Sequence, residues 1–485
     1  MYENWKKLSH SSREDQKRIQ NKKLQALMKY QIPYHPYYRE ILKKNNLSFD
    51  DIQTTDDLVK LPFTSKEDLA PTEEDRGRPK QFMLQPDESL IKKHASKGTL
   101  AKLAWGKITG KDVERELARE YKPIHLHFTT GRTALPTPFG YSERDITYLK
   151  ESANRLIDVI NVSPDNVAIN AFPYSPHLAF WLAYYGFTTV GMTSLASGGG
   201  KVMGTQKIID AIERMKAGLV AFIPGYSYHL LREAVKQKRD FSNLKYIIFG
   251  GERVSPGLRD KAKELLAQLG AKDVQIFATY AMTEGKTAWI QCAEDSGYHT
   301  YPDLEFFEVI DKEGNRVKEG EPGELVYTAL DWRGSLVMRY KTGDMVQGIE
   351  YGQCAFCGKT VPRIKSDIQR SSDVKEFQLT KIKGELVNLN NFYPLLSGMK
   401  RIEEWQVEIR KKNNDPYEID EIVVYLCTKE GESYEELSQD VKKKVYDDMF
   451  VNVVTEQKEL NILLDQLGME TELKEKRIVD NRPKS

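Results

Sequence analysis

An alternation of apolar runs and amphipathic segments between residues 207 and 277 restricts the fold more than any other feature. In the segment after the second run, Leu258, Ala262 and Leu266 recur at helical spacing, and Gly270 follows its end. Strand–helix–strand repetition of this kind predicts a largely parallel sheet covered by helices, and therefore an α/β protein. The apolar runs lie at residues 219–223, 246–249 and 274–277.

The beginning of the chain has a different pattern. Leu24, Leu27 and Met28 recur at helical spacing, so that helices are expected over about residues 1–70. Residues 69–120 form an insertion to which no role is assigned. Between Asp165 and Lys201 there is no charged residue, but the proline, glycine and hydroxyl residues within this stretch favour buried core or pocket over a membrane span.

The end of the chain predicts a second, smaller domain. Apolar runs give way to charged and hydroxyl residues near 363–373, where an interdomain hinge is expected. Beyond it, two strands joined by a polar turn are predicted, followed by two charged helices. The expected division is a large domain over residues 1–368 and a small α+β domain over residues 369–485. The strands are expected at 405–409 and 422–426, the turn at 413–416, and the helices from about Ser433 and Thr455.

The overall charge is nearly balanced. Lys plus Arg total 72 and Asp plus Glu total 71, so that no long-range field attracts nucleic acid or anionic lipid. Four Cys in so long a chain do not make a secreted disulfide scaffold, and the charged N-terminus has no signal-peptide core. We expect a reducing, cytoplasmic compartment, with neither nucleic acid nor membrane as a partner.

Residues 129–137 combine hydroxyl side chains with backbone donors near a glycine. A triphosphate tail requires such donors from a loop, although a run of this composition is more often a solvated turn. The phosphate-binding interpretation therefore depends on matching features elsewhere in the chain. The candidate phosphate-binding residues are Thr129, Thr130, Gly131, Arg132 and Thr133.

The run resembles the phosphate loop of the adenylate-forming superfamily, usually Ser/Thr-Ser/Thr-Gly-Thr-Thr-Gly-Lys-Pro, and in particular the phenylacetate–coenzyme A ligase branch. Further segments match that branch in family order: Gly-Gly-Glu at 250–252, Tyr-Ala-Met-Thr-Glu at 280–284 and Tyr-Lys-Thr-Gly-Asp at 340–344. The resemblance implies a large adenylation domain with mixed and parallel sheets flanked by helices, and a small mobile C-terminal domain. It also implies an AMP-forming ligase that uses ATP, Mg²⁺ and coenzyme A.

The resemblance assigns nucleotide-binding roles that have physical reasons. Tyr280 would stack on adenine, while Gly250 and Gly251, followed by Glu252, let the backbone approach the base. Asp344 would accept from the ribose hydroxyls, since a carboxylate can accept from two adjacent donors.

Catalytic roles follow from the same motifs. Thr283 would donate a hydrogen bond to the α-phosphate, and Glu284 would bind Mg²⁺, a cation that prefers oxygen ligands. Arg370 would add charge-assisted bonds, and Asp373 would fall on the hinge.

A lysine near the C-terminus completes the predicted site. Residues 474–480 resemble the Gly-Lys-Ala-x-Arg-Val-Val-Asp ending of the family, which makes Lys474 the catalytic lysine and Lys476 its competitor. A mobile ammonium would stabilise the charge that develops when a carboxylate attacks the α-phosphate. The phosphate loop departs from the family pattern, because Leu135 stands where Lys is usual; Arg132 would restore the charge.

Cys354 and Cys357 form a Cys-x-x-Cys pair in a turn-like sequence, typical of half a zinc site. Cys292 and His299 supply a second half, and relatives in this branch carry a metal at matching positions. Four closed ligands favour a structural Zn²⁺; the alternatives are a redox pair or unligated thiols. Cys427 is interpreted as a core residue.

The leading interpretation is an acid:CoA ligase that activates an apolar, aromatic acid through an acyl-adenylate. Phe172 and Tyr174, with the aromatic residues Trp181, Tyr184, Tyr185 and Phe187, would line the acid pocket, although core packing would explain them as well. One alternative transfers the acyl group to a carrier protein or an amine. Another is a non-catalytic nucleotide-binding relative. The resemblance to the family also implies a homodimer.

Overall fold

The computed structural model describes residues 4–110, 112–129, 136–252, 254, 256–370, 380–382, 385–387, 389–412, 420–449, 451–468 and 475–482. Several predicted features lie outside them: residues 130–135 of the phosphate loop, Asp373 of the hinge, the turn at 413–416, and Lys474. The side chain of Arg370 is also outside the description. The described chain divides into two compact units. Unit 1 contains residues 1–166, 174–194 and 277–368; unit 2 contains residues 167–173, 195–276 and 369–485.

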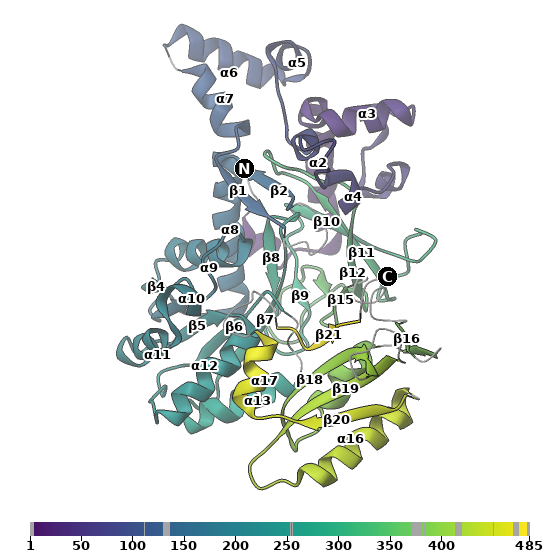
Figure 1. Cartoon of the computed structure of the whole chain (residues 1–485). Helices are drawn as coiled ribbons and strands as arrows, with labels where there is room; N and C mark the ends of the chain where they lie inside the picture. Colours follow the sequence, from purple (N-terminus) through teal and green to yellow (C-terminus); the bar gives the residue numbers. More distant parts are fainter. Residues whose placement is uncertain are drawn as a thin grey trace. The chain divides into compact units, whose positions relative to one another are not determined.

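The first unit begins with helices and continues into small antiparallel sheets (Figure 1). Most of these helices begin at side-chain caps, for example at Ser12, whose hydroxyl accepts the N–H of Asp15. Helices occur over the expected N-terminal segment, and residues 69–121 contain α5, α6 and α7. The helices are α1 (Trp5–Leu8), α2 (Arg13–Tyr30), α3 (Pro36–Lys44), α4 (Lys66–Leu69), α5 (Glu88–His94), α6 (Lys97–Ile108), α7 (Val113–Tyr121), α8 (Glu143–Ile160) and α9 (Leu178–Thr189).

Antiparallel pairing dominates the strands of this unit. β1 pairs with β2, β7 with β8, and β10–β11–β12 form a meander. The short β9, β14 and β13 form another sheet. Their bounds are β1 (His125–Phe128), β2 (Pro138–Tyr141), β7 (Gln275–Met282), β8 (Thr287–Ile290), β9 (Tyr298–His299), β10 (Glu305–Ile310), β11 (Gly323–Ala329), β12 (Tyr340–Val346), β13 (Ile349–Glu350) and β14 (Arg363–Ile364).

The second unit contains the predicted parallel sheet. β3, β5 and β6 pair in parallel, and their buried residues, such as Val220 and Ile247, belong to one hydrophobic core with the helices that follow each strand. This confirms the fold expected from the strand–helix alternation. The elements are β3 (Ala168–Asn170), β4 (Ser194–Ala196), α10 (Gly200–Met203), α11 (Thr205–Arg214), β5 (Leu219–Phe222), α12 (Pro224–Lys236), β6 (Tyr246–Phe249) and α13 (Pro256–Gln268).

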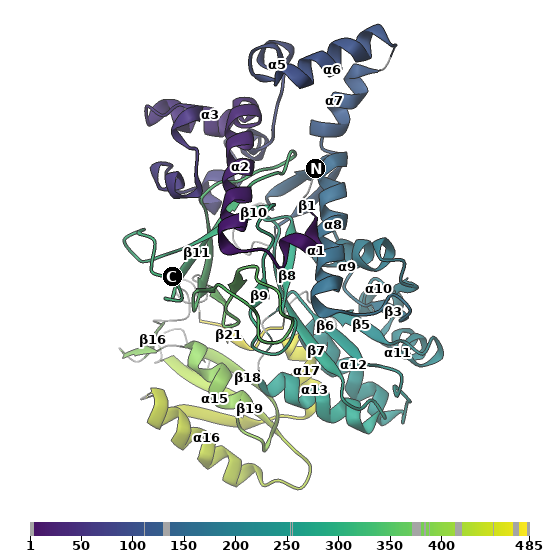
Figure 2. The same ribbon diagram turned by 180° about the vertical axis from the view of Figure 1, so that it is seen from behind.

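The C-terminal part of unit 2 builds its own sheet and core. β19 lies between β18, which is antiparallel to it, and β20, which is parallel to it; β21 pairs with the other edge of β18. Helix α16 packs on this sheet next to β20 (Figures 1 and 2). The elements are β15 (Gln369–Arg370), β16 (Thr380–Ile382), β17 (Glu385–Val387), α15 (Phe392–Ser397), β18 (Ile402–Lys411), β19 (Asp420–Thr428), α16 (Tyr434–Met449), β20 (Val453–Gln457), α17 (Leu460–Leu467) and β21 (Ile478–Asp480).

Two predictions for this region are wrong. The helix expected from Thr455 begins only at Leu460, because Thr455 lies in β20, where Val453 alternates into the core and pairs with β19. Cys427 lies in β19 but is only partly buried. No helix among the described residues has the length and apolar composition needed to cross a membrane.

Candidate nucleotide site and metal centre

Two predicted nucleotide motifs are joined by a direct hydrogen bond in unit 1. Tyr280, in β7, donates its hydroxyl to Asp344 Oδ2, in β12, at 2.7 Å. The Tyr280 ring stacks on Trp289 at 5.3 Å between centroids, which fixes its plane. Gly343 precedes Asp344 at a φ of +72°, a conformation that favours glycine. The structure therefore brings the predicted adenine and ribose residues together.

The turn after β7 carries the two predicted catalytic residues of this motif. Thr283 and Glu284 lie between β7 and β8, and Glu284 Oε1 accepts the hydroxyl of Tyr340 at 3.0 Å. Lys286 ends the turn, and its backbone N–H donates to Thr283 O at 3.2 Å. Tyr340 begins the second motif, so the 280–284 and 340–344 segments contact each other twice.

A buried ion pair anchors the same turn. Lys286 Nζ lies 3.0 Å from Asp145 Oδ2, and both side chains are fully buried. Asp145 also accepts the backbone N–H groups of Ser142, Arg333 and Gly334, at 3.1, 2.8 and 2.6 Å. A buried carboxylate needs such donors, and here they fix it beneath the turn that holds Glu284.

The two ends of the predicted phosphate loop, Thr129 and Thr137, are hydrogen-bonded to each other. Thr129 N donates to Thr137 O at 3.1 Å, and Thr137 N donates to Thr129 Oγ1 at 3.3 Å. These bonds extend the pairing of β1 with β2, so the loop leaves and re-enters a two-stranded ribbon. The predicted positions Thr130, Gly131, Arg132 and Thr133 lie outside the described residues.

Three histidines that were not among the predicted site residues lie in or beside this ribbon. His125 Nε2 lies 2.8 Å from His127 Nε2, and His127 Nδ1 lies 2.9 Å from the Tyr141 hydroxyl. His177 Nδ1 lies 3.1 Å from Phe128 O, the last carbonyl of β1. Burial lowers the pKa of both rings, that of His127 to about 3, so His127 is neutral at pH 7. The His-x-His spacing, which puts both rings on one strand face, is the signal that could have found them.

The third segment predicted to bind the nucleotide belongs to unit 2. Gly250 and Gly251 follow β6 directly, and Gly251 has a φ of +88°, which requires a residue without a Cβ penalty. Glu252 directs both carboxylate oxygens at backbone N–H groups: Oε2 accepts from Gly225 at 3.2 Å and Oε1 from Glu475 at 2.9 Å. Lys476, the competitor of Lys474, is exposed.

The aromatic residues of the predicted acid pocket differ in exposure: some are accessible to a ligand and others are buried. Tyr174 and Trp181 lie in unit 1 with ring centroids 6.0 Å apart, and Trp181 lies 5.0 Å from His125. Tyr174 is 60% exposed, so that it is accessible to a ligand. Phe187 is 1% exposed and therefore serves the core. Phe172 is buried and belongs to unit 2.

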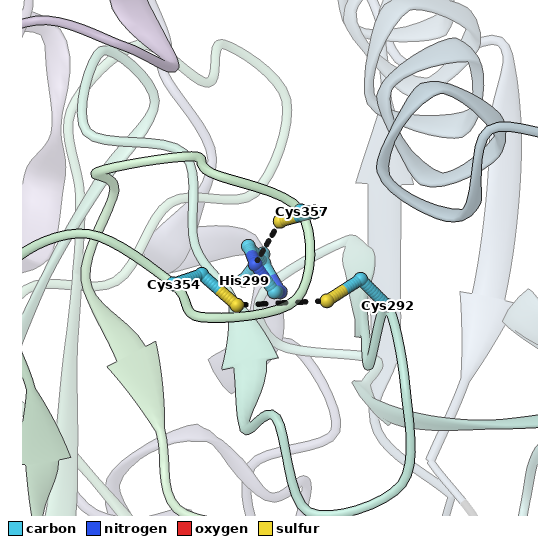
Figure 3. Close-up of side chains that lie close together, drawn as sticks. All are labelled: Cys292, His299, Cys354 and Cys357. Carbon is cyan, nitrogen blue, oxygen red and sulfur yellow. Dashed lines mark hydrogen bonds between the residues drawn. The ribbon is translucent and has the colours of Figure 1, made fainter.

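The predicted metal ligands converge on one point in unit 1. The ligand atoms of Cys292, His299, Cys354 and Cys357 all lie within 4.8 Å of one another, and Figure 3 shows the four side chains pointing together. Cys292 Sγ is 3.6 Å from Cys354 Sγ, and Cys357 Sγ is 3.2 Å from His299 Nε2. A tetrahedral zinc with bonds of about 2.3 Å sets neighbouring sulfurs about 3.8 Å apart, so the spacing fits that ion.

Contacts within the cluster stabilise a thiolate at one of its cysteines, Cys357. A hydrogen bond from Cys292 and the neighbouring His299 lower the pKa of Cys357 to about 3, whereas the bond to Cys357 and burial raise the pKa of Cys292. His299 Nδ1 lies 3.3 Å from Ile290 O, which leaves Nε2 to face the thiols. His299 Nε2 and the three sulfurs thus form a closed set of four donors.

Comparisons with known proteins agree with these motifs. The model of the AMP-binding enzyme family matches residues 45–339. The phenylacetate-coenzyme A ligases of Thermus thermophilus and Escherichia coli are 26% and 25% identical to the chain, over 75% and 68% of its length and 72% and 66% of theirs. A fatty acid–[acyl-carrier-protein] ligase of Streptomyces coeruleorubidus is 25% identical over 42% of the chain and 39% of its own length.

The fold comparison points the same way. A crystal structure of 2-hydroxyisobutyryl-CoA ligase in the postadenylation state, in complex with R3-HIB-AMP, matches with a TM-score of 0.73 and 19% identity, over 98% of this chain and 91% of that one. This likeness confirms the α/β fold, and the relatives confirm the resemblance to the phenylacetate–coenzyme A ligase branch. Because the family model matches more than half of its length, the chain belongs to the AMP-binding enzyme family.

Proposed function

We propose that the protein is an ATP-dependent, AMP-forming acid:CoA ligase. The observation that carries this proposal is the double link between the 280–284 and 340–344 motifs, Tyr280 to Asp344 and Tyr340 to Glu284, in a chain of the AMP-binding enzyme family. The link holds an aromatic ring, a carboxylate for ribose and a carboxylate for a cation in fixed relation. The adenine, the ribose and the Mg²⁺ that accompanies the phosphates of ATP are the groups that such residues bind.

The reaction has two steps. An oxygen of the substrate carboxylate attacks the α-phosphorus of ATP, the acyl–phosphate bond forms, and the bond to the β-phosphate oxygen breaks, so that pyrophosphate leaves. The thiol of coenzyme A then loses its proton and attacks the acyl carbon, and AMP leaves. In our proposal Thr283 donates to the α-phosphate and Lys474 balances the charge of the first step. Glu284 would hold Mg²⁺, which supplies charge neutralisation at the phosphates.

The small domain is proposed to comprise residues 369–485 and to turn about the hinge between the two steps. Its separate sheet and core, with Trp405 and Val424 at the centre, support a body that keeps its structure during such a turn. A cytoplasmic location and a homodimer stay predictions of the sequence.

The metal cluster is proposed to hold one structural zinc. Cys292, His299, Cys354 and Cys357 supply four donors and leave no open position, so that the ion would tie two loops together and take no part in the reaction.

An aromatic or otherwise apolar acid is the proposed substrate class. The accessible Tyr174 beside Trp181, next to the strand that leads into the phosphate loop, supports this choice. Flat apolar surfaces of this kind bind aromatic rings by stacking and edge contacts.

Incubation with ATP, Mg²⁺, coenzyme A and a panel of carboxylic acids tests the proposal. Mass spectrometry should detect acyl-CoA and AMP for one class of acid. Acyl-adenylate that accumulates without thioester would point instead to a carrier protein or an amine as the acceptor. A protein that binds ATP but yields neither product with any acid would contradict the proposal and favour a non-catalytic nucleotide-binding protein.

A further inference from the structure

The carboxylate of Glu252 caps a helix to which it is not adjacent in sequence. Helix α12 begins with Pro224 and has no side-chain cap of its own. Glu252, from the loop after β6, supplies one by accepting the Gly225 N–H on Oε2 at 3.2 Å. The positive end of the helix dipole also stabilises a carboxylate at this position. One oxygen of Glu252 is thus fixed to the large parallel sheet and its helices.

The other oxygen holds the segment that follows the predicted catalytic lysine. Glu252 Oε1 accepts the N–H of Glu475 at 2.9 Å. This N–H belongs to the peptide bond between Lys474 and Glu475. The Glu475 carboxylate in turn accepts from Arg477 Nε at 2.7 Å, a bond within the same segment.

The crowding at this point shows how closely three segments meet. A Cβ added at Gly225 would lie 3.1 Å from Glu475 Oε2 and 3.4 Å from Glu252 Oε2. The buried Arg477 extends the link to β18, where its Nη1 donates to Glu404 Oε1 at 2.5 Å. The Glu475 segment therefore lies between the α12 N-terminus and the C-terminal sheet.

Separate contacts hold the C-terminal elements on α12 and α13. Tyr228 donates its hydroxyl to Glu403 Oε1 at 2.9 Å, and Lys261 Nζ donates to Glu403 O at 2.5 Å. Leu464 and Leu467 of α17 pack against Tyr228 in a small apolar cluster, and α17 lies beside α13 in Figures 1 and 2. Loss of the Glu252 carboxylate would leave these contacts in place. The Glu475 segment would therefore shift while the C-terminal elements stay on α12 and α13.

We propose that Glu252 is a positioning residue for the adenylation step, which holds the lysine-bearing segment against the nucleotide-side loop. This inference rests on the proposed function. Glu252 directly follows Gly250 and Gly251, so its bond to Glu475 places the neighbour of Lys474 at the loop assigned to adenine. The bond must break when the small domain turns for the coenzyme A step. Glu252 therefore assists the first half-reaction and has no part in the second.

The test measures the two half-reactions separately with the full-length protein. Glu252→Ala should slow acyl-adenylate formation by about tenfold or more, as expected for loss of a charge-assisted bond that orients a catalytic group. It should change thioester formation from supplied acyl-adenylate by less than about twofold. Glu475→Pro removes the N–H donor and should reproduce this split, whereas Glu475→Ala keeps the donor and should slow adenylation much less. Glu252→Ala in the Glu475→Pro background should slow adenylation little further, because both changes remove the same Glu252–Glu475 bond.

Controls separate this role from others. Glu264→Ala removes a largely exposed carboxylate that pairs with Lys429 elsewhere between α13 and the C-terminal part, and it should leave both half-reactions unchanged. Equal loss in both half-reactions of Glu252→Ala would overturn the inference and make Glu252 a nucleotide-binding residue. Wild-type protein that forms no acyl-adenylate would refute the proposed function instead. Hydrogen exchange then decides the positioning link: faster exchange of the Glu475 amide in Glu252→Ala supports it, and unchanged exchange overturns it.

Discussion

The ion pair beneath the catalytic turn predicts an unequal response to its two deletions. Lys286 and Asp145 are fully buried and 3.0 Å apart. Removal of one partner of a buried pair costs about 3–5 kcal/mol. In Lys286→Met, Asp145 keeps three backbone N–H donors, from Ser142, Arg333 and Gly334. The free energy of unfolding should therefore fall by about 3 kcal/mol.

Asp145→Asn should cost more, near about 5 kcal/mol, because it leaves a buried ammonium without its carboxylate and also weakens the bonds to those N–H groups. Lys286 faces Tyr141 and Trp332, with Nζ 4.9 and 5.1 Å from the ring centroids, and these rings replace only part of the lost interaction. The double variant should be more stable than Asp145→Asn alone, since it buries no charge.

Urea unfolding followed by tryptophan fluorescence measures the order, with denaturation midpoints compared among the three variants and the wild type. An Asp145→Asn variant as stable as Lys286→Met, or a double variant less stable than both, would refute the reasoning. Lys286 closes the turn of Thr283 and Glu284. Variants with a lower denaturation midpoint should therefore also form acyl-adenylate more slowly.

Other predictions concern the metal, a buried acid and the lysine. Elemental analysis should find about one zinc per chain, and Cys354→Ser with Cys357→Ser should lower both metal content and melting temperature; metal-free protein unaffected by chelator would contradict this. Burial raises the pKa of Glu305 to about 8 from 4.5, so the folded state keeps a proton that the unfolded state releases. The free energy of unfolding should therefore fall as pH rises from about 4.5 to about 8, a loss that Glu305→Gln removes; a pH-independent wild type would be inconsistent with it. Lys474→Ala should slow adenylation by several orders of magnitude and spare thioester formation from supplied adenylate, and equal losses would remove the assignment.

The parallel sheet could be predicted because its signal is local. Buried parallel strands are continuous apolar runs, and the runs at 219–223 and 246–249 became β5 and β6 almost residue for residue. The segment at Thr455 was misjudged because its structure depends on a distant partner: β20 exists through its pairing with β19, and the alternation Val453, Val454 was too short to show it.

The site residues also differ in whether the local sequence reveals them. Cys354 and Cys357 are recognisable by spacing, and Cys292 and His299 could be added because ligand chemistry restricts the choice. The imidazole pair beside the predicted phosphate loop could not be inferred, since only the pairing of β1 with β2 brings Tyr141 to His127. The Glu252–Glu475 bond was equally hidden, because it joins segments far apart in the sequence through a backbone donor.

Acid-dependent ATP–pyrophosphate exchange tests the central claim most directly. The account predicts that labelled pyrophosphate enters ATP only when ATP, Mg²⁺ and a suitable carboxylic acid are all present, and that the acyl-adenylate of that acid is found in the same mixture. An aromatic or apolar acid should give the fastest exchange. Absence of exchange across a broad acid panel, with protein that is folded and binds ATP, would contradict the assignment of this chain as an adenylate-forming ligase.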